Sequence, residues 1–414
     1  MISLILIVVY LSIYVGLVAT SFYVLSFLQS KEKNKKLFKD NELPFVSVII
    51  PAYNEENSIA KTLRSILSSD YPENKFEVIV VDDGSKDKTY EIAKRFQGKQ
   101  VRIFTKKNGG KGSALNFGIK QIKGDFVLSM DADTFVSPKS LKNMIRYFKD
   151  EKVMSVTAAM VTEKPKNIWQ RVQNVEYLFG LFLRKAFATV NAVYITPGAF
   201  SAYRKSFCDK YGGYEEGNIT EDLELSMRIQ KEGFVIENCP DAPVYTIAPR
   251  SFKALTIQRR RWYFGLIKNT LKYKQLFGPK YGDLGLFVLP VAWISIFFSI
   301  FVILYLIFDT ARKIRSEVLF LYEINFDILN LVNLNLYVFE RYLFLLFTNA
   351  VFLFIIFFIA ILGFYLYYAS KKIGRLSGLA INLPLFFIFF AFLFGFWWVI
   401  SIVYALSAKN VKWR

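Results

Sequence analysis

The sequence predicts an α/β domain with a mostly parallel sheet, embedded in an α-helical membrane protein with about four transmembrane helices. Two observations predict this class. Four apolar segments, each long enough to cross about 30 Å of hydrocarbon, lie at 2–28, 284–308, 342–369 and 379–406. Between the first and the second, a polar stretch alternates strand-like and helix-like runs with short connections, which is typical of a parallel sheet covered by helices.

The first apolar segment is expected to be a membrane anchor. Residues 2–28 contain no charged side chain, and no small-residue cleavage site stands out, so a cleaved signal peptide is the weaker interpretation. The predicted organisation is a first transmembrane helix (1–30), an α/β domain (31–248), interfacial helices (249–280) and a membrane domain with three further transmembrane helices (281–414).

Basic residues on both sides of the α/β domain predict its orientation, because Lys and Arg accumulate at the cytoplasmic ends of spans. They are Lys31, Lys33, Lys35, Lys36 and Lys39 after the first span, and Lys268, Lys272, Lys274 and Lys280 before the second. We therefore expect an integral protein of the cell (plasma) membrane with a cytoplasmic catalytic domain. Four spans would put Arg312, Lys313 and Arg315 outside, with the tail (Lys409, Lys412, Arg414). Basic residues outside the cell argue mildly against a topology with four spans. A segment such as 318–335 could instead lie on the membrane surface.

The composition excludes several kinds of chemistry. The chain has no histidine, which removes Ser-His, Cys-His and His-zinc catalysis. Its two cysteines, Cys208 and Cys239, have no metal-ligand spacing and indicate no disulfide framework. The net charge of +19 would suit nucleic acid, but a membrane enzyme that handles anionic headgroups and diphosphates is also basic. We expect membrane lipids as partners and no nucleic acid.

The α/β domain begins with four predicted strands. They are the apolar runs at 45–51, 76–85, 101–105 and 126–130. Helices are expected from Ile59, over 87–97, after the Gly-rich turn of 108–124 and after Pro138. Further helices are expected over 166–190 and from Thr220, whose hydroxyl would cap the helix.

Polar pairs follow three of these strands: Asn54-Glu55, Asp82-Asp83 and Asp131-x-Asp133. Each pair alone could be a turn or a helix cap. Ligands of parallel sheets bind beyond the carboxyl ends of the strands, so three such pairs together predict one site.

Asp131 and Asp133 would repel each other unless a hard divalent cation lay between them and a diphosphate, and Mg²⁺ or Mn²⁺ suits such oxygen ligands. The turn NGGKG (108–112) adds Lys111, which suits phosphate, although this motif alone is weak.

Seven motifs in order carry a resemblance to a known family. VSVIIPAYNEE (46–56), VIVVDDGSKDKT (78–89), GGKGSALNFGI (109–119) and DAD (131–133) resemble the nucleotide-sugar half of the inverting family-two glycosyltransferases. TPGAFSAYRKS (196–206), ITEDLELSMRIQKEGF (219–234) and QRRRW (258–262) resemble the processive, membrane-bound branch, which includes the hyaluronan, chitin, cellulose and poly-N-acetylglucosamine synthases. The match covers about 46–265, and the Q-x-x-R-W element is its most telling part.

The resemblance implies a GT-A, Rossmann-like fold, a nucleotide-diphosphate sugar donor that is most often UDP-linked, and specific residue roles. Ala52, Asn54, Glu55 and Asp83 would surround the nucleoside. Asp131 and Asp133 would bind the metal and the diphosphate, and Asp222 would be the general base. Gln258, Arg261 and Trp262 would contact the diphosphate and the acceptor. Glu221 and Glu224 are the nearest competitors for the base.

Two further segments are expected near the acceptor and the bilayer. Gln173, Glu176 and Tyr177, on the helix predicted over 166–190, could line the acceptor path, since the family often has a similar Gln-x-x-Glu-Tyr there. Residues 249–275 mix aromatic and cationic side chains as an interfacial helix does, and Arg259 and Arg260 could face lipid headgroups.

Three functions are weighed. The leading hypothesis is a hexosyl or N-acetylhexosaminyl transferase that extends a β-linked polysaccharide with sugar from a UDP-sugar. The alternative is transfer of a single sugar to a lipid-phosphate or lipid-linked acceptor, which the small membrane part favours. A transporter or scaffold whose soluble domain only binds nucleotide is disfavoured, because Asp131, Asp133, Asp222 and the Q-x-x-R-W residues are present together. Motif spacing specifies neither the sugar nor the linkage.

Overall fold

The computed structural model describes residues 4–29, 36–326, 336–348, 350–373 and 379–407. Three lysines of the predicted basic flank (Lys31, Lys33 and Lys35), the C-terminal lysines and Arg414, and residues 327–335 lie outside the described residues.

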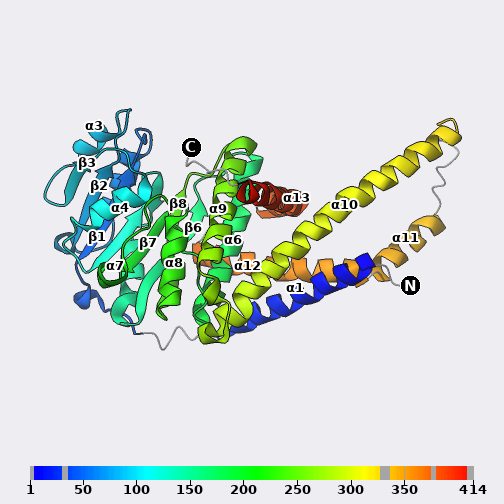
Figure 1. Cartoon of the computed structure of the whole chain (residues 1–414), viewed down its shortest axis with the longest axis horizontal. Coiled ribbons are helices and arrows are strands. Elements are labelled where there is room, and N and C mark those ends of the chain that lie inside the picture. Colours follow the sequence, from blue (N-terminus) through cyan, green and yellow to red (C-terminus); the bar gives the residue numbers. More distant parts are fainter. Residues whose placement is uncertain (1–3, 30–35, 327–335, 349, 374–378, 408–414) are drawn as a thin grey trace.

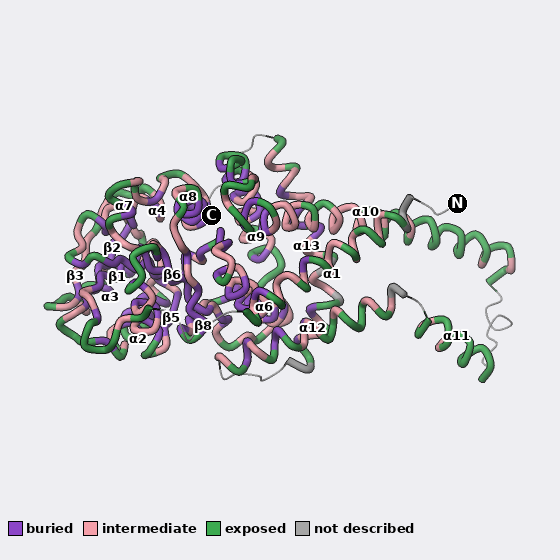
Figure 2. The backbone as a smooth tube through the Cα atoms, turned by 90° about the horizontal axis from the view of Figure 1, so that it is seen from below, coloured by how far each residue is buried: buried purple, intermediate pink, exposed green. Residues whose placement is uncertain are grey.

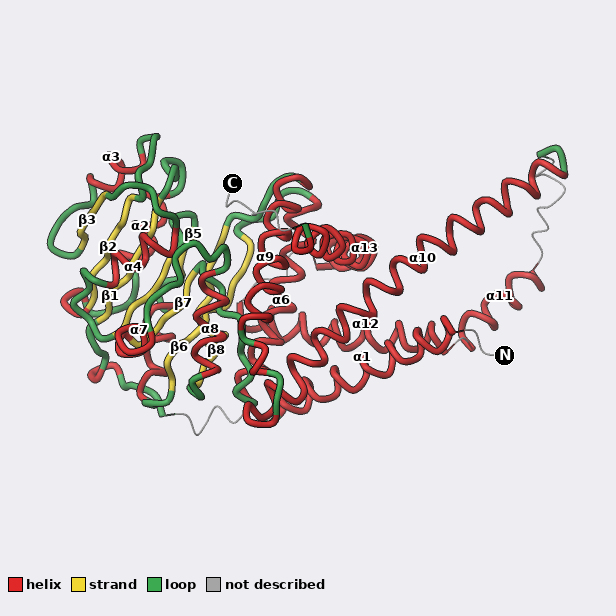
Figure 3. Tube along the Cα trace, in the orientation of Figure 1, coloured by secondary structure: helices red, strands yellow, loops and turns green. Residues whose placement is uncertain are grey.

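Within the described residues, eight strands form one mixed sheet in the order β3-β2-β1-β4-β7-β6-β8-β5 (Figures 1 and 3). The strands are β1 (Val46–Ala52), β2 (Phe76–Asp82), β3 (Val101–Thr105), β4 (Phe126–Met130), β5 (Thr134–Val136), β6 (Val153–Thr162), β7 (Phe200–Arg204) and β8 (Val235–Thr246). The predicted strands correspond to β1–β4, which pair in parallel. Strand β7 then runs antiparallel to β4 and β6, and β5 antiparallel to β8.

Helices cover both faces of the sheet, which explains why β1, β2 and β4 are buried along their whole length. Successive side chains of β1 enter opposite layers: Val48 packs with α2 (Ile59–Leu67), α3 (Thr89–Lys94) and α5 (Ser140–Ile145). Ile49 packs with α4 (Lys111–Ile119), α7 (Lys205–Tyr211) and α8 (Glu221–Lys231). Short 3-10 turns lie at Asp40–Glu42, Glu73–Lys75, Arg146–Lys149, Lys274–Leu276 and Pro279–Tyr281.

Two long helices join the sheet domain to the apolar helices. Helix α6 (Ile168–Thr189) packs on β6 and β8 on one side and on α1 (Leu4–Leu28), α12 (Ala350–Ile373) and α13 (Leu379–Leu406) on the other. Helix α9 (Phe252–Lys272) packs on α8 and α13. Figure 2 shows buried residues concentrated in the sheet domain and around α6 and α9, whereas the outer turns of α10 (Leu289–Glu323) and α11 (Leu336–Thr348) are exposed.

Among the described residues, three helices are long and apolar enough to cross a membrane, and the bent pair within α13 would make a fourth span. Two predicted spans have different bounds. The second continues from a π-helical turn (Leu284–Val288) through α10 to Glu323, so the charged residues at 309–315 lie on a helix. The third, predicted at 342–369, is divided between α11 and α12, and its candidate crossing is Phe352–Lys372.

Candidate active site

The polar residues after β1 and β2 order the loops at the sheet edge. The Ala52 carbonyl accepts a hydrogen bond from the Asp83 N–H, at 2.8 Å. The Asp83 carboxylate, 3% exposed, accepts from the Gly109 and Gly110 N–H groups at 3.0 and 2.7 Å and pairs with Lys106 Nζ at 2.9 Å. Asp83 thus connects the end of β2 to the Gly-rich turn that precedes Lys111.

Asn54 has a left-handed backbone, with φ of 56°, a conformation that asparagine tolerates better than most residues. Its Oδ1 accepts from the Lys86 N–H at 2.8 Å, and its own N–H donates to Ser85 Oγ at 2.9 Å. The predicted nucleoside residues therefore lie together at the ends of β1 and β2.

Lys111 links the two halves of the predicted site. Its Nζ lies 2.6 Å from Asp131 Oδ1 after β4 and 3.4 Å from Glu221 Oε1 at the start of α8. Burial alone would lower the Lys111 pKa, but Asp131, Glu221 and Asp222 hold it well above its usual range. Motifs separated by about a hundred residues in the sequence thus converge on one ammonium group.

Asp133 lies beside further carboxylates. Burial, with the charges of Asp131 and Glu55, raises the Asp133 pKa well above its usual range, and Lys111 only partly opposes this. The negative charge at this edge is therefore incompletely neutralised, as expected of a site for a hard cation. No group of three or more Asp, Glu, Cys or His residues in the described ranges forms a complete metal site. Asp131 and Asp133 fit Mg²⁺ or Mn²⁺ only if water and substrate oxygens supply the other ligands.

Asp222 is the second residue of α8. Its Oδ2 accepts from the Gly198 N–H at 2.7 Å, and its Oδ1 accepts from the Leu223 N–H at 2.8 Å. A Cβ at position 198 would lie 2.8 Å from both Asp222 Oδ2 and Lys111 Nζ, so only glycine permits this approach. Gly198 lies in the motif TPGAFSAYRKS (196–206) but was not among the predicted site residues, although a glycine between polar motifs is a signal of close backbone approach.

The two other acids of α8 have different surroundings. Burial raises the Glu221 pKa, although the Lys111 charge opposes it. Glu224 pairs with Arg228 at 2.5 Å and accepts a hydrogen bond from the Tyr273 hydroxyl. The Glu224 carboxylate is therefore occupied by its contacts with Arg228 and Tyr273, whereas Glu221 and Asp222 face Lys111.

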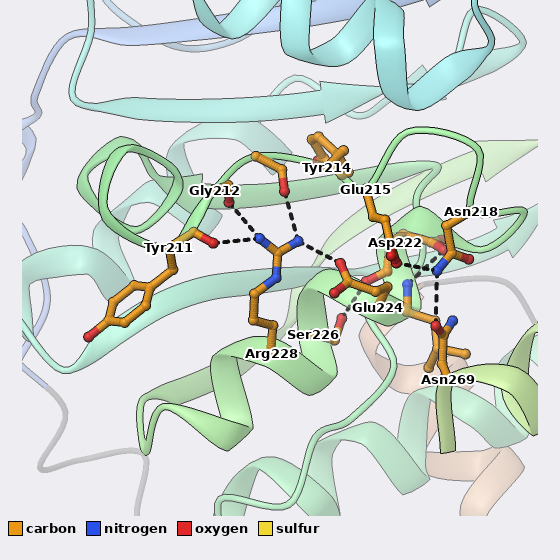
Figure 4. Close-up of polar contacts among 12 residues, drawn as sticks. Tyr211, Gly212, Tyr214, Glu215, Asn218, Asp222, Glu224, Ser226, Arg228 and Asn269 are labelled. Carbon is orange, nitrogen blue, oxygen red and sulfur yellow. Dashed lines mark hydrogen bonds and ion pairs between the residues drawn. The ribbon is translucent and has the colours of Figure 1, made fainter. Parts of the chain in front are cut away.

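Polar contacts around α8 hold it in place (Figure 4). Arg228 donates to the carbonyls of Tyr211, Gly212 and Gly213 at 2.7–2.8 Å. Thr220 is the N-cap residue of α8 as predicted, but its hydroxyl makes no cap hydrogen bond. It instead accepts from Asn269 Nδ2 of α9 at 2.9 Å, because α9 approaches α8 closely.

The Q-x-x-R-W segment on α9 contacts the helix that carries Gln173, Glu176 and Tyr177. Gln173 Nε2 donates to Gln258 Oε1 at 2.8 Å and to the Tyr177 hydroxyl at 2.9 Å. Arg259 donates to both Glu176 oxygens, at 2.6 and 2.5 Å. Two predicted segments on different helices are thus joined through side chains.

The prediction that Arg259 faces lipid headgroups is wrong. Arg259 is 1% exposed and lies 4.5 Å from the Trp262 ring centroid and 5.5 Å from that of Trp397. The Glu176 carboxylate and these two rings make its burial possible. Gln258, Arg261 and Trp262 are partly buried along α9.

Comparison with known proteins agrees with the motifs. Residues 47–212 match the family model of glycosyl transferase family 2. The chain is 31% identical over 262 residues to poly-beta-1,6-N-acetyl-D-glucosamine synthase of Staphylococcus aureus (strain MSSA476), covering 62% of this chain and 63% of that protein. The Staphylococcus epidermidis (strain ATCC 35984) protein of the same name is 31% identical over 265 residues, with the same coverage. The chain therefore spans just under two thirds of the length of these relatives.

Among solved structures, the chain resembles a mannosyltransferase from Pyrobaculum calidifontis in complex with GDP-Man and Mn2+. The TM-score is 0.63 at 18% identity, covering 97% of this chain and 100% of that chain. At this identity the likeness concerns the fold. The resemblance stated from the motifs and the GT-A fold class are confirmed.

Proposed function

We propose that this chain, in which residues 47–212 match glycosyl transferase family 2, is a membrane-bound inverting glycosyltransferase that extends a β-linked polysaccharide from a UDP-sugar. The observation that carries the proposal is the convergence of Lys111, Asp131, Glu221 and Asp222, where a strand end suited to a diphosphate meets a carboxylate on α8. The names of the staphylococcal relatives support N-acetylglucosamine as the sugar.

The donor would lie along the ends of β1, β2 and β4. Ala52, Asn54, Glu55 and Asp83 would surround the nucleoside, and Lys111 would contact the diphosphate. Asp131 and Asp133 would hold Mg²⁺ or Mn²⁺, which when bound supplies positive charge for the departing diphosphate.

Asp222 would take the proton of the acceptor hydroxyl. The Gly198 and Leu223 N–H groups orient its carboxylate and leave each oxygen a second lone pair for that proton. In an inverting transfer the base lies opposite the leaving group, which requires the acceptor to approach from the α8 side. Glu221, closer to Lys111, would help to hold that lysine.

The acceptor would lie between α6 and α9. Trp262 offers a flat apolar surface for a sugar ring, and Gln258 and Arg261 offer polar contacts. The Glu176–Arg259 pair would fix the spacing of the two helices, with Tyr177 beside it. We propose that this site lies at the cytoplasmic surface of the cell membrane, because basic residues such as Lys268 and Lys272 lie next to the second candidate span.

The test is UDP release by the purified protein with a panel of UDP-sugars and Mg²⁺ or Mn²⁺, followed by sizing of the product. We expect turnover of a single UDP-sugar, such as UDP-N-acetylglucosamine, into long glycosidase-sensitive material. Absence of UDP release with every sugar and both metals would contradict the proposal.

A second candidate function is the transfer of a single sugar to a lipid-phosphate or lipid-linked acceptor. One observation favours it: the buried edge of the Arg184 guanidinium has no hydrogen-bond partner in the described part of the chain. A product of one or two sugars that extracts into organic solvent would support this function over polymer synthesis.

A further inference from the structure

Arg184, near the C-terminal end of α6, has a buried donor edge. Its Nε and Nη2 atoms are buried and have no hydrogen-bond partner among the described residues. These two nitrogens form the edge of a guanidinium that binds carboxylates and phosphates. Elsewhere in this chain, Arg102 uses the same edge, with Nε and Nη2 at 3.1 and 2.8 Å from Glu77 Oε2.

Three other cations near the site have a carboxylate partner among the described residues. Lys111 pairs with Asp131, Arg228 with Glu224 and Arg259 with Glu176. Arg184 differs, because burial lowers the pKa of its guanidinium to about 10 and only the Tyr177 hydroxyl opposes this among the described groups. A buried cation without a counter-charge is costly, so its retention points to an anion that binds there.

Arg184 belongs to a polar stripe on α6. Gln173, Tyr177, Gly180 and Arg184 are spaced by four, three and four residues, which places them on one face of the helix. A Cβ at Gly180 would meet the Arg184 guanidinium first, with Nη1 at 3.2 Å, so the missing side chain at Gly180 leaves room for that guanidinium. Gln173 Oε1 in the same stripe is also buried without a partner among the described residues.

The stripe belongs to a helix that packs against the apolar helices α1, α12 and α13. The charges of both Asp133 and Arg184 act on the Tyr177 hydroxyl, so Tyr177 lies near both groups. On another face of α6, Phe182 stacks on Tyr365 of α12, with ring centroids 3.7 Å apart. A group that reaches Arg184 from the membrane would thus lie on the acceptor side of the site.

We propose that Arg184 binds the phosphate group of a membrane lipid through its Nε–Nη2 edge, which has no partner among the described residues. The candidate spans α1 and α12 pack directly on α6, so lipid headgroups would lie near this helix. A neutral sugar could hydrogen-bond to the edge but would leave its charge uncompensated. A lipid-phosphate acceptor and a bound phospholipid share the required chemistry.

The experiment uses the full chain in a phosphate-free maltoside detergent. Dioctanoyl phosphatidic acid, dioctanoylglycerol and inorganic phosphate are titrated separately, and unfolding is followed by tryptophan fluorescence. We expect phosphatidic acid to raise the Tm of the wild type by on the order of 5 °C, and the other two probes to have little effect.

Three variants test the residue. Arg184→Gln should abolish the shift without lowering the Tm of the lipid-free protein, because it removes an uncompensated buried charge. Arg184→Lys should retain only part of the shift, because an ammonium lacks the two-point edge. Arg171→Gln, the same change on the roughly opposite face of α6, should keep the full shift.

The outcomes separate the alternatives without requiring catalysis, so the inference can fail while the proposed function stands. The proposal would be overturned if phosphatidic acid raised the Tm of the wild type and of Arg184→Gln equally, or if it did not raise the Tm of the wild type. It would also be overturned if dioctanoylglycerol or inorganic phosphate raised the Tm as much as phosphatidic acid does. If the shift depends on Arg184, radiolabelled donor sugar then identifies the source. Label in the extracted lipid indicates a phosphate on the acceptor, and unlabelled lipid indicates a phospholipid bound beside it. Either result supports the site.

Discussion

The absence of a side chain at Gly198 allows the candidate base and Lys111 to approach each other, so Gly198→Ala tests the site with a single methyl group. The added Cβ would lie 2.8 Å from Asp222 Oδ2 and from Lys111 Nζ, whereas ordinary contacts begin at 3.4 Å. Each polar atom must therefore retreat by roughly half an ångström. Both atoms are at the ends of side chains, so they can move without a shift of the backbone.

The size of the effect follows from that displacement. A misplacement of about 1 Å at a reacting group costs up to 10²-fold in rate. Half that distance should lower kcat by roughly tenfold, about 1.4 kcal/mol in the activation barrier. The donor KM should change less than kcat, although Lys111 would also shift, because the three atoms nearest to the new methyl group belong to Asp222 and Lys111 and none to the predicted nucleoside residues. The Tm should fall only slightly.

The assay is steady-state UDP release, with Tm measured on the same preparation. Gly98→Ala is the matched control, because a Cβ at Gly98 has no atom within 4 Å. An unchanged kcat in Gly198→Ala would refute the argument that Asp222 and Lys111 must approach this closely. A large loss of Tm would instead show that the backbone could not accommodate the methyl group.

Three further predictions follow from the same contacts. Asp222→Asn should lower UDP-release kcat by about 10²- to 10⁴-fold while donor binding, measured by calorimetry, is retained; an active variant would exclude Asp222 as the base. A chelator should abolish turnover and Mn²⁺ or Mg²⁺ should restore it, with Asp133→Asn needing more metal; turnover that persists in chelator would contradict a metal at Asp131 and Asp133. Glu176→Gln should destabilise the protein by about 3–5 kcal/mol in thermal unfolding, and Arg259→Gln in the same chain should recover part of that loss; equal stability of the single variant would contradict a buried ion pair.

The parallel half of the sheet could be predicted because its strands carry a local signal. Strands β1, β2 and β4 are buried on both faces, so each is a nearly continuous apolar run that ends in polar residues. Strand β8 lacks such a run, since Pro240, Asp241 and Pro243 interrupt it. Its pairing with β6 also shifts register after Thr157, so neither strand has a clear period.

The candidate site likewise contains residues that could be predicted from the sequence and residues that could not. The aspartates after β4 and the start of α8 are recognisable within short segments. The environment of Arg259 could not be recognised from a short segment, because its partner Glu176 is 83 residues away in the sequence and Trp397 is on the last helix. An arginine beside a membrane segment is most simply assigned to headgroups until those partners are known.

The length of α10 has a comparable cause. The predicted span stopped near Asp309 because charges begin there. Helix formation does not require apolar residues, and Asp309 pairs with Arg312 at 2.8 Å and with Lys313 at 3.0 Å, at helical spacing. Hydropathy therefore located the apolar part of the helix but not its end.

Side-chain contacts connect the sheet domain to the apolar helices. Helix α6 contacts the apolar helices through Phe182 and contacts α9 through Gln173 and Glu176. Arg259, held by Glu176, lies against Trp262, so the position of the candidate sugar platform depends on α6. Trp397 of α13 lies on the same guanidinium, which ties the platform to the apolar helices a second time. The proposed acceptor side of the site therefore lies on the helices that contact the apolar helices, while the proposed donor side lies at strand ends. Displacing α6 should consequently impair use of the acceptor more than binding of the donor.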